Sequence, residues 1–323
     1  MFLFVHNALR SFVQVDRDIL ATEHEVDELD HSVPSHLTAL PASLRAADLV
    51  FCWFASLHSL GPVLGASLLR KPSVVVVGGY DTACMPEIGY GSMAHPVKRH
   101  VVRLICRTAS ALLVNSNAAK AEVRRHVGVP TPIEVCYHGF APVSATLPVE
   151  REPIALSIGN VSRESLTRKG HEAFVRAAAL APELRFVLVG QCLDDAADIL
   201  RRIATPNVEI VGFMPEPELN RLRSSASAYV QASAHEGFGC ALAEAMLAGC
   251  IPVVSRRGAL PEVAGEFGRW IDEHDPAAIA RAVKEALHVS ADERKAIAVS
   301  IETRFSLERR RQQLLQIVRR VAS

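Results

Sequence analysis

The stretch that decides the fold is AYVQASAHEGFGCALAEAMLAGCIPVVS, residues 228–255. It begins and ends with a short apolar run typical of a buried β-strand, and the helical pattern between the runs ends at Gly249, since glycine often terminates helices. Two strands joined through a helix run parallel in one sheet. The stretch also carries two glutamates, Glu236 and Glu244. It therefore predicts a parallel sheet, with one carboxylate just after a strand and a second on the helix that follows.

The same alternation of apolar runs and helical patterns extends over the whole chain. Continuous β-branched runs flanked by helices are typical of parallel sheets that are covered on both faces. A break rich in proline and small residues, 139–153, separates two sets of such runs and resembles a linker. The sequence therefore predicts an α/β protein with two doubly wound parallel-sheet domains that face a central cleft. Strands are predicted at residues 2–5, 48–54, 72–79, 111–115 and 133–138, and again at 154–160, 185–190, 208–213, 228–233 and 251–255.

The predicted domains are residues 1–145, residues 146–304 and a C-terminal helix at residues 305–323. That helix carries apolar side chains on one side and arginines on the other. We expect its apolar side to pack back on the N-terminal domain, and membrane-surface binding by its arginines is the alternative. Because ligands of open α/β sheets bind beyond the carboxyl ends of the strands, function is expected in the loops that follow them.

Composition excludes several classes of protein. Lysine plus arginine and aspartate plus glutamate both number 35, so the net charge is zero and a general nucleic-acid grip is not expected. The seven cysteines lack the close spacing of zinc sites, which indicates reduced thiols in a cytoplasmic protein. The N-terminal apolar run is too short for a signal peptide. Residues 49–69 carry no charged side chain, but Gly61 and Pro62 favour a strand, a loop and a helix over a transmembrane span.

The two glutamates of the first stretch suit different tasks. The turn Gly237-Phe238-Gly239 places Glu236 beside a helix N-terminus, whose backbone N–H groups favour a phosphate or a developing anion. Glu244 lies deeper in the helix, where its carboxylate can accept hydrogen bonds from two ribose hydroxyls. The alternative is a pair of solvated helix charges.

Three segments together resemble the signature of the family 4 retaining glycosyltransferases, which have the GT-B fold. They are HEGFGCALAEAMLAGCIPVVSRRGALPEVAG at 235–265, LSIGNVSRESLTRKGHEAFVRAAA at 156–179 and NVEIVGFMPEPEL at 207–219. The resemblance is strong in the C-terminal half and weaker before it. It implies GT-B architecture, with two Rossmann-like domains, the first binding the acceptor and the second a nucleotide-sugar donor.

The family motif implies roles for individual residues. Glu236 would lie against the donor sugar at the reaction centre, Glu244 would bind the ribose, and Lys169 would neutralise the donor diphosphate, where the leaving group gains charge. Gly159 and Asn160 stand where the family often has Gly-Arg, so the second phosphate contact is in doubt. Arg168 or Arg163 would compensate, and a solvated surface role is the alternative for each. Backbone groups near the donor are expected at Gly237, Phe238, Gly239, Gly212, Phe213 and Met214.

The N-terminal half offers weaker candidates. Tyr80 and Asp81 follow a strand where related enzymes often carry a histidine. Asp81 would be catalytic, touching donor hydroxyls or the acceptor nucleophile, or it would cap a helix. His95 would belong to an acceptor loop or to an ordinary surface loop. Arg10 and Ser11 follow the first strand and suit acceptor contact.

The resemblance thus implies a retaining, metal-independent enzyme that moves a sugar from a nucleoside-diphosphate donor to a hydroxyl of a glycan, glycolipid or small metabolite. The alternatives are a nucleotide-sugar epimerase, a glycosyl phosphorylase of the same fold, or an inactive nucleotide-sugar-binding protein. No cofactor and no metal site are expected, because no cluster with ligand spacing occurs. The expected partners are the nucleotide-sugar donor and a carbohydrate or lipid-linked acceptor. The expected location is the cytoplasm, with peripheral contact at the inner face of the membrane left open by the basic stretches.

Overall fold

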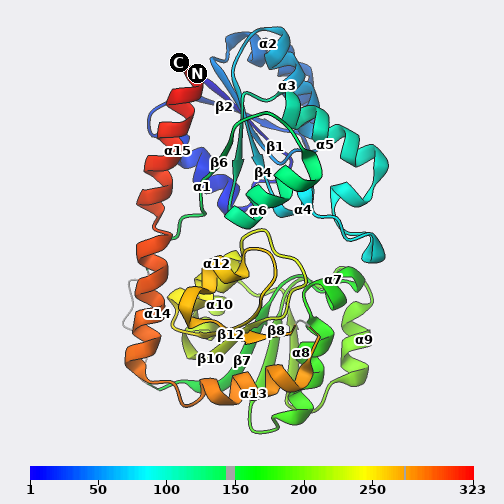
Figure 1. Ribbon diagram of the computed structural model, residues 1–323, viewed down its shortest axis with the longest axis vertical. Coiled ribbons are helices and arrows are strands. Elements are labelled where there is room, and N and C mark those ends of the chain that lie inside the picture. Colours follow the sequence, from blue (N-terminus) through cyan, green and yellow to red (C-terminus); the bar gives the residue numbers. More distant parts are fainter. Residues whose placement is uncertain (143–149, 273) are drawn as a thin grey trace. The chain divides into compact units, whose positions relative to one another are not determined.

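The computed structural model describes residues 1–142, 150–272 and 274–323. These form two compact units: Met1–Gly139 together with Leu307–Ser323, and Phe140–Ser306. The predicted boundary between residues 145 and 146 lies outside the described residues. Figure 1 shows the helices and strands of each unit and labels those for which there is room.

The N-terminal unit is built on a six-stranded parallel sheet with the order β2-β1-β3-β4-β5-β6. Its strands are β1 Phe2–His6, β2 Val26–Asp30, β3 Leu49–Trp53, β4 Ser73–Val77, β5 Ala111–Val114 and β6 Ile133–Val135. Its helices are α1 Ser11–Ala21, α2 Pro34–Ala46, α3 Leu57–Leu68, α4 Gly79–Thr82, α5 Pro96–Thr108, α6 Asn117–Glu122 and α15 Leu307–Ala322, with short turns of 3-10 helix at η1 Pro86–Ile88 and η2 Ser92–Ala94.

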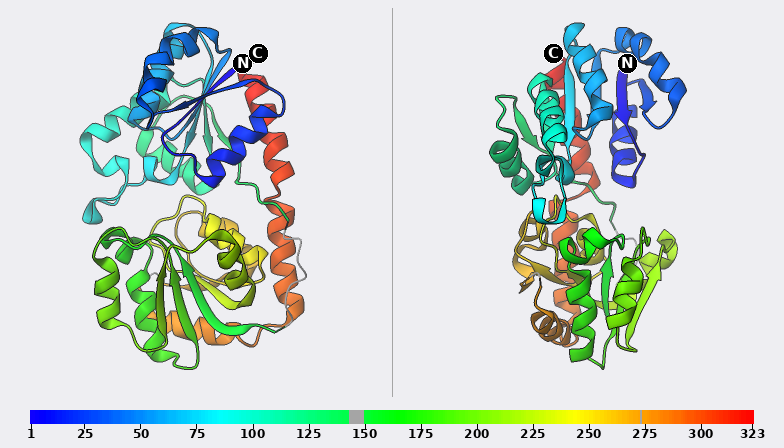
Figure 2. Two further views of the ribbon diagram at one scale, coloured as in Figure 1. Left: turned by 180° about the vertical axis from the view of Figure 1, so that it is seen from behind. Right: turned by 90° about the vertical axis from the view of Figure 1, so that its right-hand side faces the viewer.

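Both faces of this sheet are covered, which explains why its central strands are apolar throughout. Val50, Val75 and Leu112 point to one face and pack in a cluster with α2, α3 and α5. Phe51 and Val76 belong to the opposite face, which α1 and α15 cover. Figure 2 shows this layering from two sides. Because the four inner strands β1, β3, β4 and β5 are buried on both sides, their side chains do not alternate between apolar and polar, and each strand appears in the sequence as one apolar run.

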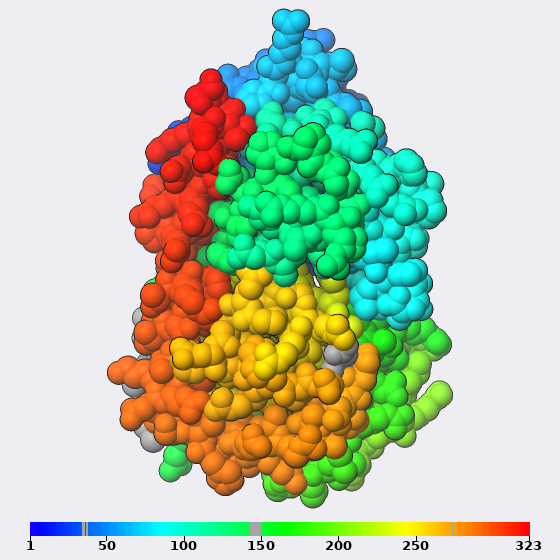
Figure 3. All heavy atoms as spheres, viewed as in Figure 1, coloured from blue at the N-terminus to red at the C-terminus, as the bar shows by residue number. Residues whose placement is uncertain are grey.

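Helix α15 returns to the N-terminal unit after the chain has formed the second unit. Its apolar side chains, among them Leu314 and Val318, are buried against the sheet and α1. Arg310 ties it to α1: its Nε lies 2.6 Å from Asp16 Oδ1, its second terminal nitrogen lies 2.7 Å from Oδ2, and both side chains are essentially unexposed. The outer side of α15, red in Figure 3, stays at the surface.

The C-terminal unit repeats the design with the strand order β12-β11-β10-β7-β8-β9, again all parallel. Its strands are β7 Glu152–Ile158, β8 Arg185–Val189, β9 Val208–Gly212, β10 Ala226–Gln231, β11 Ile251–Ser255 and β12 Arg269–Ile271. Its helices are α7 Arg163–Arg168, α8 His171–Ala177, α9 Ala196–Ile203, α10 Glu216–Ser225, α11 Cys240–Leu247, α12 Leu260–Ala264, α13 Pro276–Ala286 and α14 Ala291–Arg304. Helices α8 and α13 pack together, as do α11 and α14.

The predicted fold class is confirmed, since each unit is a parallel sheet flanked by helices. Each sheet changes its direction of growth once. In the N-terminal sheet the chain moves from β1 outward to β2 and then crosses to β3, so the change lies between β1 and β3. In the C-terminal sheet it lies between β7 and β10. Such switch points leave a crevice at the carboxyl ends of the strands, where ligands of this architecture bind. Among the described residues no helix is long and apolar enough to cross a membrane.

Candidate functional site

The switch point of the C-terminal sheet brings together two of the predicted residues. Lys169 follows α7 after β7, and Glu236 follows the neighbouring strand β10. Lys169 Nζ lies 3.5 Å from Glu236 Oε2, and both side chains remain about one-fifth exposed (20% and 19%). Gln231, the last residue of β10, donates from Nε2 to the same carboxylate oxygen at 2.6 Å. The result is an ion pair that is held at one end and open to solvent.

Backbone contacts fix the two loops that carry this pair. The Ala234 N–H donates to the Arg168 carbonyl at 2.7 Å, which ties the loop after β10 to the loop before α8. Gly159 leaves room for Lys169, because a Cβ atom there would lie 2.8 Å from the lysine Cδ and would displace that side chain. Gly258, at φ +54°, lies so close to Glu236 that a Cβ would meet its carbonyl oxygen at 2.1 Å. Small residues thus let the chain pass closely around the pair.

The charges around Glu236 keep its carboxyl group ionised. Burial acts to raise the pKa of Glu236, but the positive charges of Lys169 and Arg168 outweigh burial and hold that pKa below its ordinary value. Behind Lys169 lies His171, which is buried. Burial and the neighbouring Lys169 lower the pKa of His171 to about 3, so its imidazole is neutral. The cationic group that forms an ion pair with the Glu236 carboxylate is Lys169, at 3.5 Å.

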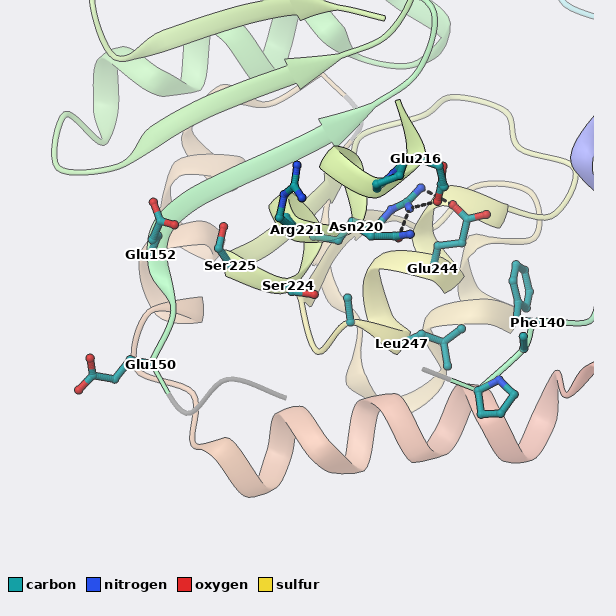
Figure 4. A pocket seen from close by; sticks show the side chains of 15 residues that line it. Phe140, Glu150, Glu152, Glu216, Asn220, Arg221, Ser224, Ser225, Glu244 and Leu247 are labelled. Carbon is teal, nitrogen blue, oxygen red and sulfur yellow. Dashed lines mark hydrogen bonds and ion pairs between the residues drawn. The ribbon is translucent and has the colours of Figure 1, made fainter. Parts of the chain in front are cut away.

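Glu244 lies on α11, which begins after Gly239 at φ +100°. Its Oε2 accepts a hydrogen bond from Arg223 of α10 at 2.5 Å. Arg223 is 3% exposed and also binds Glu216 Oε1 at 2.6 Å and Asn220 Oδ1 at 2.8 Å. Figure 4 shows Glu216, Asn220 and Glu244 converging, with dashed lines for these bonds. Burial raises the pKa of Glu244, and Arg223 opposes that shift.

Sequence reasoning missed Arg223. It sits within the helical pattern of residues 216–226, where an arginine is usually a solvated surface residue, and only the fold shows that it is buried against α11. The signal available was indirect, since α10 leads into β10 and therefore lies next to the motif helix in space. Its place shows that Glu244 is held by a neighbouring helix through one oxygen, while the other oxygen has no hydrogen bond within the described part of the chain.

A cavity of about 770 Å³ opens beside this cluster (Figure 4). Glu216, Arg223 and Glu244 line it, together with Leu247 and residues of α10. Lys169 and Glu236 do not line it. The cavity is therefore at the Glu244 end of the candidate site, and its volume is in the range of small-molecule sites.

Both arginines predicted as candidates for a second phosphate contact bind carboxylates within the C-terminal unit. Arg163 is largely exposed, and its Nε donates to Asp195 Oδ1 at 2.6 Å. Arg168 forms an ion pair with Glu164 one helical turn away. Asn160, which follows Gly159, is exposed. Of these three, Arg168 is the one whose charge acts on Glu236.

The glycine-containing turns play different parts. Phe238 is 3% exposed and packs against Phe140 and Phe305, with ring centroids 6.1 and 5.3 Å away, so its side chain belongs to the interior of the C-terminal unit. The turn after β9 is different: Gly212 has φ +82°, Phe213 is 76% exposed and Met214 is partly exposed. An exposed aromatic ring at a strand end offers a surface on which a flat ring can stack.

In the N-terminal unit, Asp81 occupies a structural position. Its side chain is 1% exposed, and Oδ2 accepts hydrogen bonds from the backbone N–H groups of Gly78 at 2.8 Å and Ala55 at 3.1 Å. Burial raises the pKa of Asp81 to about 7, against the effect of these hydrogen bonds. The geometry is that of the helix-capping alternative, since the carboxylate faces the backbone of two strand-end loops.

The other N-terminal candidates are more exposed. The Tyr80 hydroxyl accepts a hydrogen bond from Lys98 Nζ at 3.0 Å. The imidazole of His95 lies 3.1 Å from the Gly89 carbonyl and is partly exposed. Arg10 and Ser11 are exposed at the start of α1, where Arg10 is the N-cap residue. Tyr80 lies in α4, His95 precedes α5, and Arg10 and Ser11 lie at the start of α1, so the four residues come from three separate segments and form no common hydrogen-bonded cluster.

The C-terminal arrangement can bind and stabilise an anion next to a carboxylate. Lys169 supplies a positive charge, Glu236 an ionised carboxylate 3.5 Å away, and Glu244 an oriented acceptor on the adjoining helix. No group of three or more histidine, cysteine, aspartate or glutamate side chains within residues 1–142, 150–272 and 274–323 is arranged to hold a metal ion.

Comparison with known families and proteins bears on this site. The family described as "Glycosyl transferases group 1" matches residues 144–302, and "Glycosyltransferase Family 4" matches residues 20–142. The O-antigen chain mannosyltransferase B of Escherichia coli is 35% identical over 80 residues, which are 25% of this chain and 21% of that protein. The GDP-mannose:cellobiosyl-diphosphopolyprenol alpha-mannosyltransferase of Xanthomonas oryzae pv. oryzae is 27% identical over 283 residues, 83% of this chain and 69% of that protein.

Solved structures show the same fold at low sequence identity. Sucrose-phosphate synthase from Thermosynechococcus elongatus superposes with a TM-score of 0.78 at 19% identity, covering 99% of this chain and 98% of the other. Anabaena HepE in complex with UDP and glucose superposes with a TM-score of 0.75 at 17% identity, covering 98% of both chains.

Proposed function

Because the chain belongs to the family 4 glycosyltransferases, which have the GT-B fold, we propose that it transfers a hexosyl group from a nucleoside-diphosphate sugar to an acceptor hydroxyl with retention of configuration. The observation that carries the proposal is the Lys169–Glu236 pair at the switch point of the C-terminal sheet. It combines a cation for a departing diphosphate with an ionised carboxylate for the sugar.

Lys169 acts on the leaving group. When the bond between the sugar and the diphosphate breaks, negative charge grows on the phosphate oxygen, and a fixed cation stabilises that charge more in the transition state than in the ground state. Lys169 is suited to this task, because its only ionic partner in the described residues is Glu236 at 3.5 Å, a distance that leaves the ammonium group free to bind a phosphate oxygen.

Glu236 acts on the sugar. Its depressed pKa makes it an anion near neutral pH, so it can accept hydrogen bonds from sugar hydroxyls and balance positive charge that develops on the ring. An ionised carboxylate is not a proton donor, and we therefore assign it no acid role. In the proposed mechanism the acceptor attacks from the face of the leaving group, and the departing phosphate takes the acceptor's proton.

Glu244 holds the nucleoside. One oxygen is fixed by Arg223, which orients the carboxylate, and the other is available to a ribose hydroxyl. Phe213 and the backbone of the Gly212–Met214 turn offer a place for the base. The buried Phe238 is excluded from direct stacking, and its role is to shape the turn that carries Glu236.

Mannose is the sugar that we propose for the donor. Two relatives are named mannosyltransferases, and the one matched over most of this chain is named as an enzyme that uses GDP-mannose and a diphosphopolyprenol-linked acceptor. We accordingly propose GDP-mannose as the donor and a carbohydrate or lipid-linked saccharide as the acceptor, with catalysis that needs no metal ion.

The proposal is tested by product analysis. The purified protein is incubated with GDP-mannose, UDP-glucose or ADP-glucose, each with and without a cellobiosyl-diphosphate lipid. We expect GDP release from GDP-mannose only when acceptor is present, an α-linked product by NMR, and the same rate in EDTA. Lys169→Met should slow release by about 10²–10³-fold, and Lys295→Met on the exposed face of α14 is the matched control.

The alternatives give other products. An epimerase would convert the sugar without needing an acceptor, and a phosphorylase would require inorganic phosphate. An inactive binding protein would bind a nucleotide without any turnover, and that result with every acceptor tried would overturn the proposed activity.

A further inference from the structure

The N-terminal unit contains a second cavity, of about 460 Å³, at its own switch point. Asn7 follows β1, His31 follows β2, Ser56 and His58 follow β3, and Tyr80 follows β4, and all five line it. The cavity therefore lies beyond the carboxyl ends of four adjacent strands. This is the place where an open parallel sheet binds its ligand, and none of the donor-site residues belongs to it.

The side chains that line the cavity include a positive charge and no negative charge. Lys98 lines it, and no aspartate or glutamate does. The neighbouring carboxylates are turned elsewhere, since Asp30 binds Ser32 and Asp81 binds the backbone of Gly78 and Ala55. Within the described ranges Lys98 has no carboxylate partner, and its Nζ donates to the Tyr80 hydroxyl.

Two helices begin at this cavity. Leu57 and His58 are the first residues of α3, and Val97 and Lys98 lie in the first turn of α5. Neither helix has an acidic residue in its first turn. Helices of 12 and 13 residues carry partial positive charge at their N-termini, which adds to the charge of Lys98. An anion is the ligand that this field favours.

Several polar side chains that line the cavity have no hydrogen-bond partner within the described residues. Ser92 is 2% exposed, and its hydroxyl forms no hydrogen bond within the described chain, nor do the side chains of His31 and Asn7. Because Lys98 donates to Tyr80, the phenolic hydrogen of Tyr80 is left to be donated to a ligand. His58 is different: its ring bonds the Trp53 carbonyl and Ser56, and burial lowers its pKa.

The rim is apolar. Leu57 is 70% exposed and Val97 is 77% exposed, on the first turns of the two helices, and Val101 and Val102 extend the wall. Exposed aliphatic side chains next to an anion-binding centre suit a ligand with an apolar part close to its charge.

We propose that this cavity binds a phosphate group carried by the acceptor, with Lys98, Tyr80, Ser92 and the N-termini of α3 and α5 as its ligands. The inference rests on the proposed function, because it assigns the cavity to the second substrate of the transfer. A phosphorylated acceptor has two possible sources, a lipid diphosphate and a soluble sugar phosphate. The exposed Leu57 and Val97 favour the lipid.

The test is calorimetric titration of the full chain with farnesyl diphosphate, farnesol and glucose 6-phosphate. Saturating GDP is present, so that the donor site is blocked. We expect farnesyl diphosphate to bind and farnesol to bind at least tenfold more weakly. Lys98→Met should weaken the binding of farnesyl diphosphate about tenfold or more, as expected for a lost charged hydrogen bond. Lys98→Arg should recover most of the affinity. Lys295→Met is the matched control.

The outcomes separate the two proposals. Binding of glucose 6-phosphate that depends on Lys98, without binding of farnesyl diphosphate, supports the site and makes the soluble sugar phosphate its ligand. Binding that Lys98→Met leaves unchanged but Lys169→Met removes would place the anion in the donor site and overturn the inference. The same holds if no phosphorylated probe binds. In both cases, binding of GDP to the unaltered chain would leave the proposed function standing. If the unaltered chain does not bind GDP, the proposed function and the inference are both overturned.

Discussion

The two units of the chain each contain an ion pair between distant segments, and the two pairs differ in almost every property. Asp16 and Arg310 in the N-terminal unit are 0% and 1% exposed and joined by two hydrogen bonds, at 2.6 and 2.7 Å. Arg310 also donates to the carbonyls of Cys136 and Tyr137. Lys169 and Glu236 in the C-terminal unit are about one-fifth exposed and lie 3.5 Å apart.

The two pairs show which features separate an ion pair that stabilises the fold from the pair that we propose acts on the substrate. Each guanidinium nitrogen of Arg310 and each carboxylate oxygen of Asp16 has a hydrogen-bond partner in the protein, and both side chains are buried, so the task of this pair is to hold α15 on α1. The Lys169–Glu236 pair is loose, sits at a switch point and is surrounded by glycines that keep side chains away. Breaking the first should cost stability, and breaking the second should cost activity.

The largest effect is expected from Arg310→Met. It leaves the Asp16 carboxylate buried without a partner, which costs about 3–5 kcal/mol of unfolding free energy. Chemical denaturation followed by circular dichroism measures the loss. The double variant Asp16→Leu/Arg310→Met should recover much of it, because an apolar pair of similar volume fits the same place.

An exposed pair between α15 and the segment that follows α1 is the control. Arg319 binds Glu23 at the surface, and Arg319→Met should change the unfolding free energy by less than about 1 kcal/mol. Equal losses of unfolding free energy in Arg310→Met and Arg319→Met would show that burial does not make the Asp16–Arg310 pair more important for stability than the exposed pair.

The next largest effect is expected from Lys169→Met. Turnover should fall by about 10²–10³-fold, the usual effect of losing one group that stabilises transition-state charge. The unfolding free energy should change by less than about 1 kcal/mol, because the pair is partly exposed. Steady-state kinetics and denaturation on the same preparation give both numbers. A large loss of stability with unchanged turnover would show that Lys169 and Glu236 form a structural pair, contrary to this prediction.

Arg223→Gln should weaken nucleotide binding about tenfold through the lost charged hydrogen bond to Glu244. This loss of nucleotide affinity should become larger as the pH falls from 8 to 6. Burial and the negative charge of Glu216 on α10 raise the pKa of Glu244, and the variant removes the positive charge of Arg223 that opposes them. A protonated Glu244 is a poorer acceptor for ribose hydroxyls. Titrations at several pH values measure the effect.

Two variants sharpen this prediction. Arg221, on the same helix and lining the same cavity, is exposed, so Arg221→Gln should leave affinity and its pH dependence unchanged. Arg223→Lys should restore part of the affinity. A loss in Arg223→Gln that is the same at every pH would indicate that Arg223 only supports the packing of α10.

The smallest effect is expected from Asp81→Asn, which keeps an oxygen for the N–H groups of Gly78 and Ala55. The folded protein holds the Asp81 proton up to about pH 7, compared with an ordinary pKa of 3.8. The unaltered chain should therefore lose stability as the pH rises from 4 to 7, since the contribution of a raised pKa is present below the unfolded value and lost through the folded one. The variant should show a shallower decline and normal turnover, and a hundredfold loss of turnover would restore a catalytic role for Asp81.

Most of the fold could be predicted from the sequence, because the inner strands of both sheets are buried on both faces and read as apolar runs. The strands that escaped prediction are both at edges. β2, with the sequence VDELD, is acidic, and β12 has three residues, two of which have partly exposed side chains. An edge strand is paired on one side only, so its sequence is less constrained toward apolar residues.

The candidate site was predictable where a linear motif carries it. Lys169 and Glu236 are 67 positions apart, and their proximity follows from the adjacency of β7 and β10. Arg223 was not predictable in the same way, because its partner Glu244 lies on another helix. The position of Asp81 depended on a hydrogen bond to Ala55, whose place in space no local pattern reveals.

The most direct test of the account is calorimetric titration of GDP into the unaltered chain and into Glu244→Gln and Lys169→Met. The account predicts that GDP binds the unaltered chain in preference to UDP and ADP. Glu244→Gln should weaken the binding of GDP about tenfold or more. Lys169→Met should lower the contribution of the diphosphate to the binding free energy, so that the affinities for GDP and for guanosine become more similar. Equal affinity for GDP in all three proteins would contradict the assignment of the donor site to the C-terminal unit's switch point.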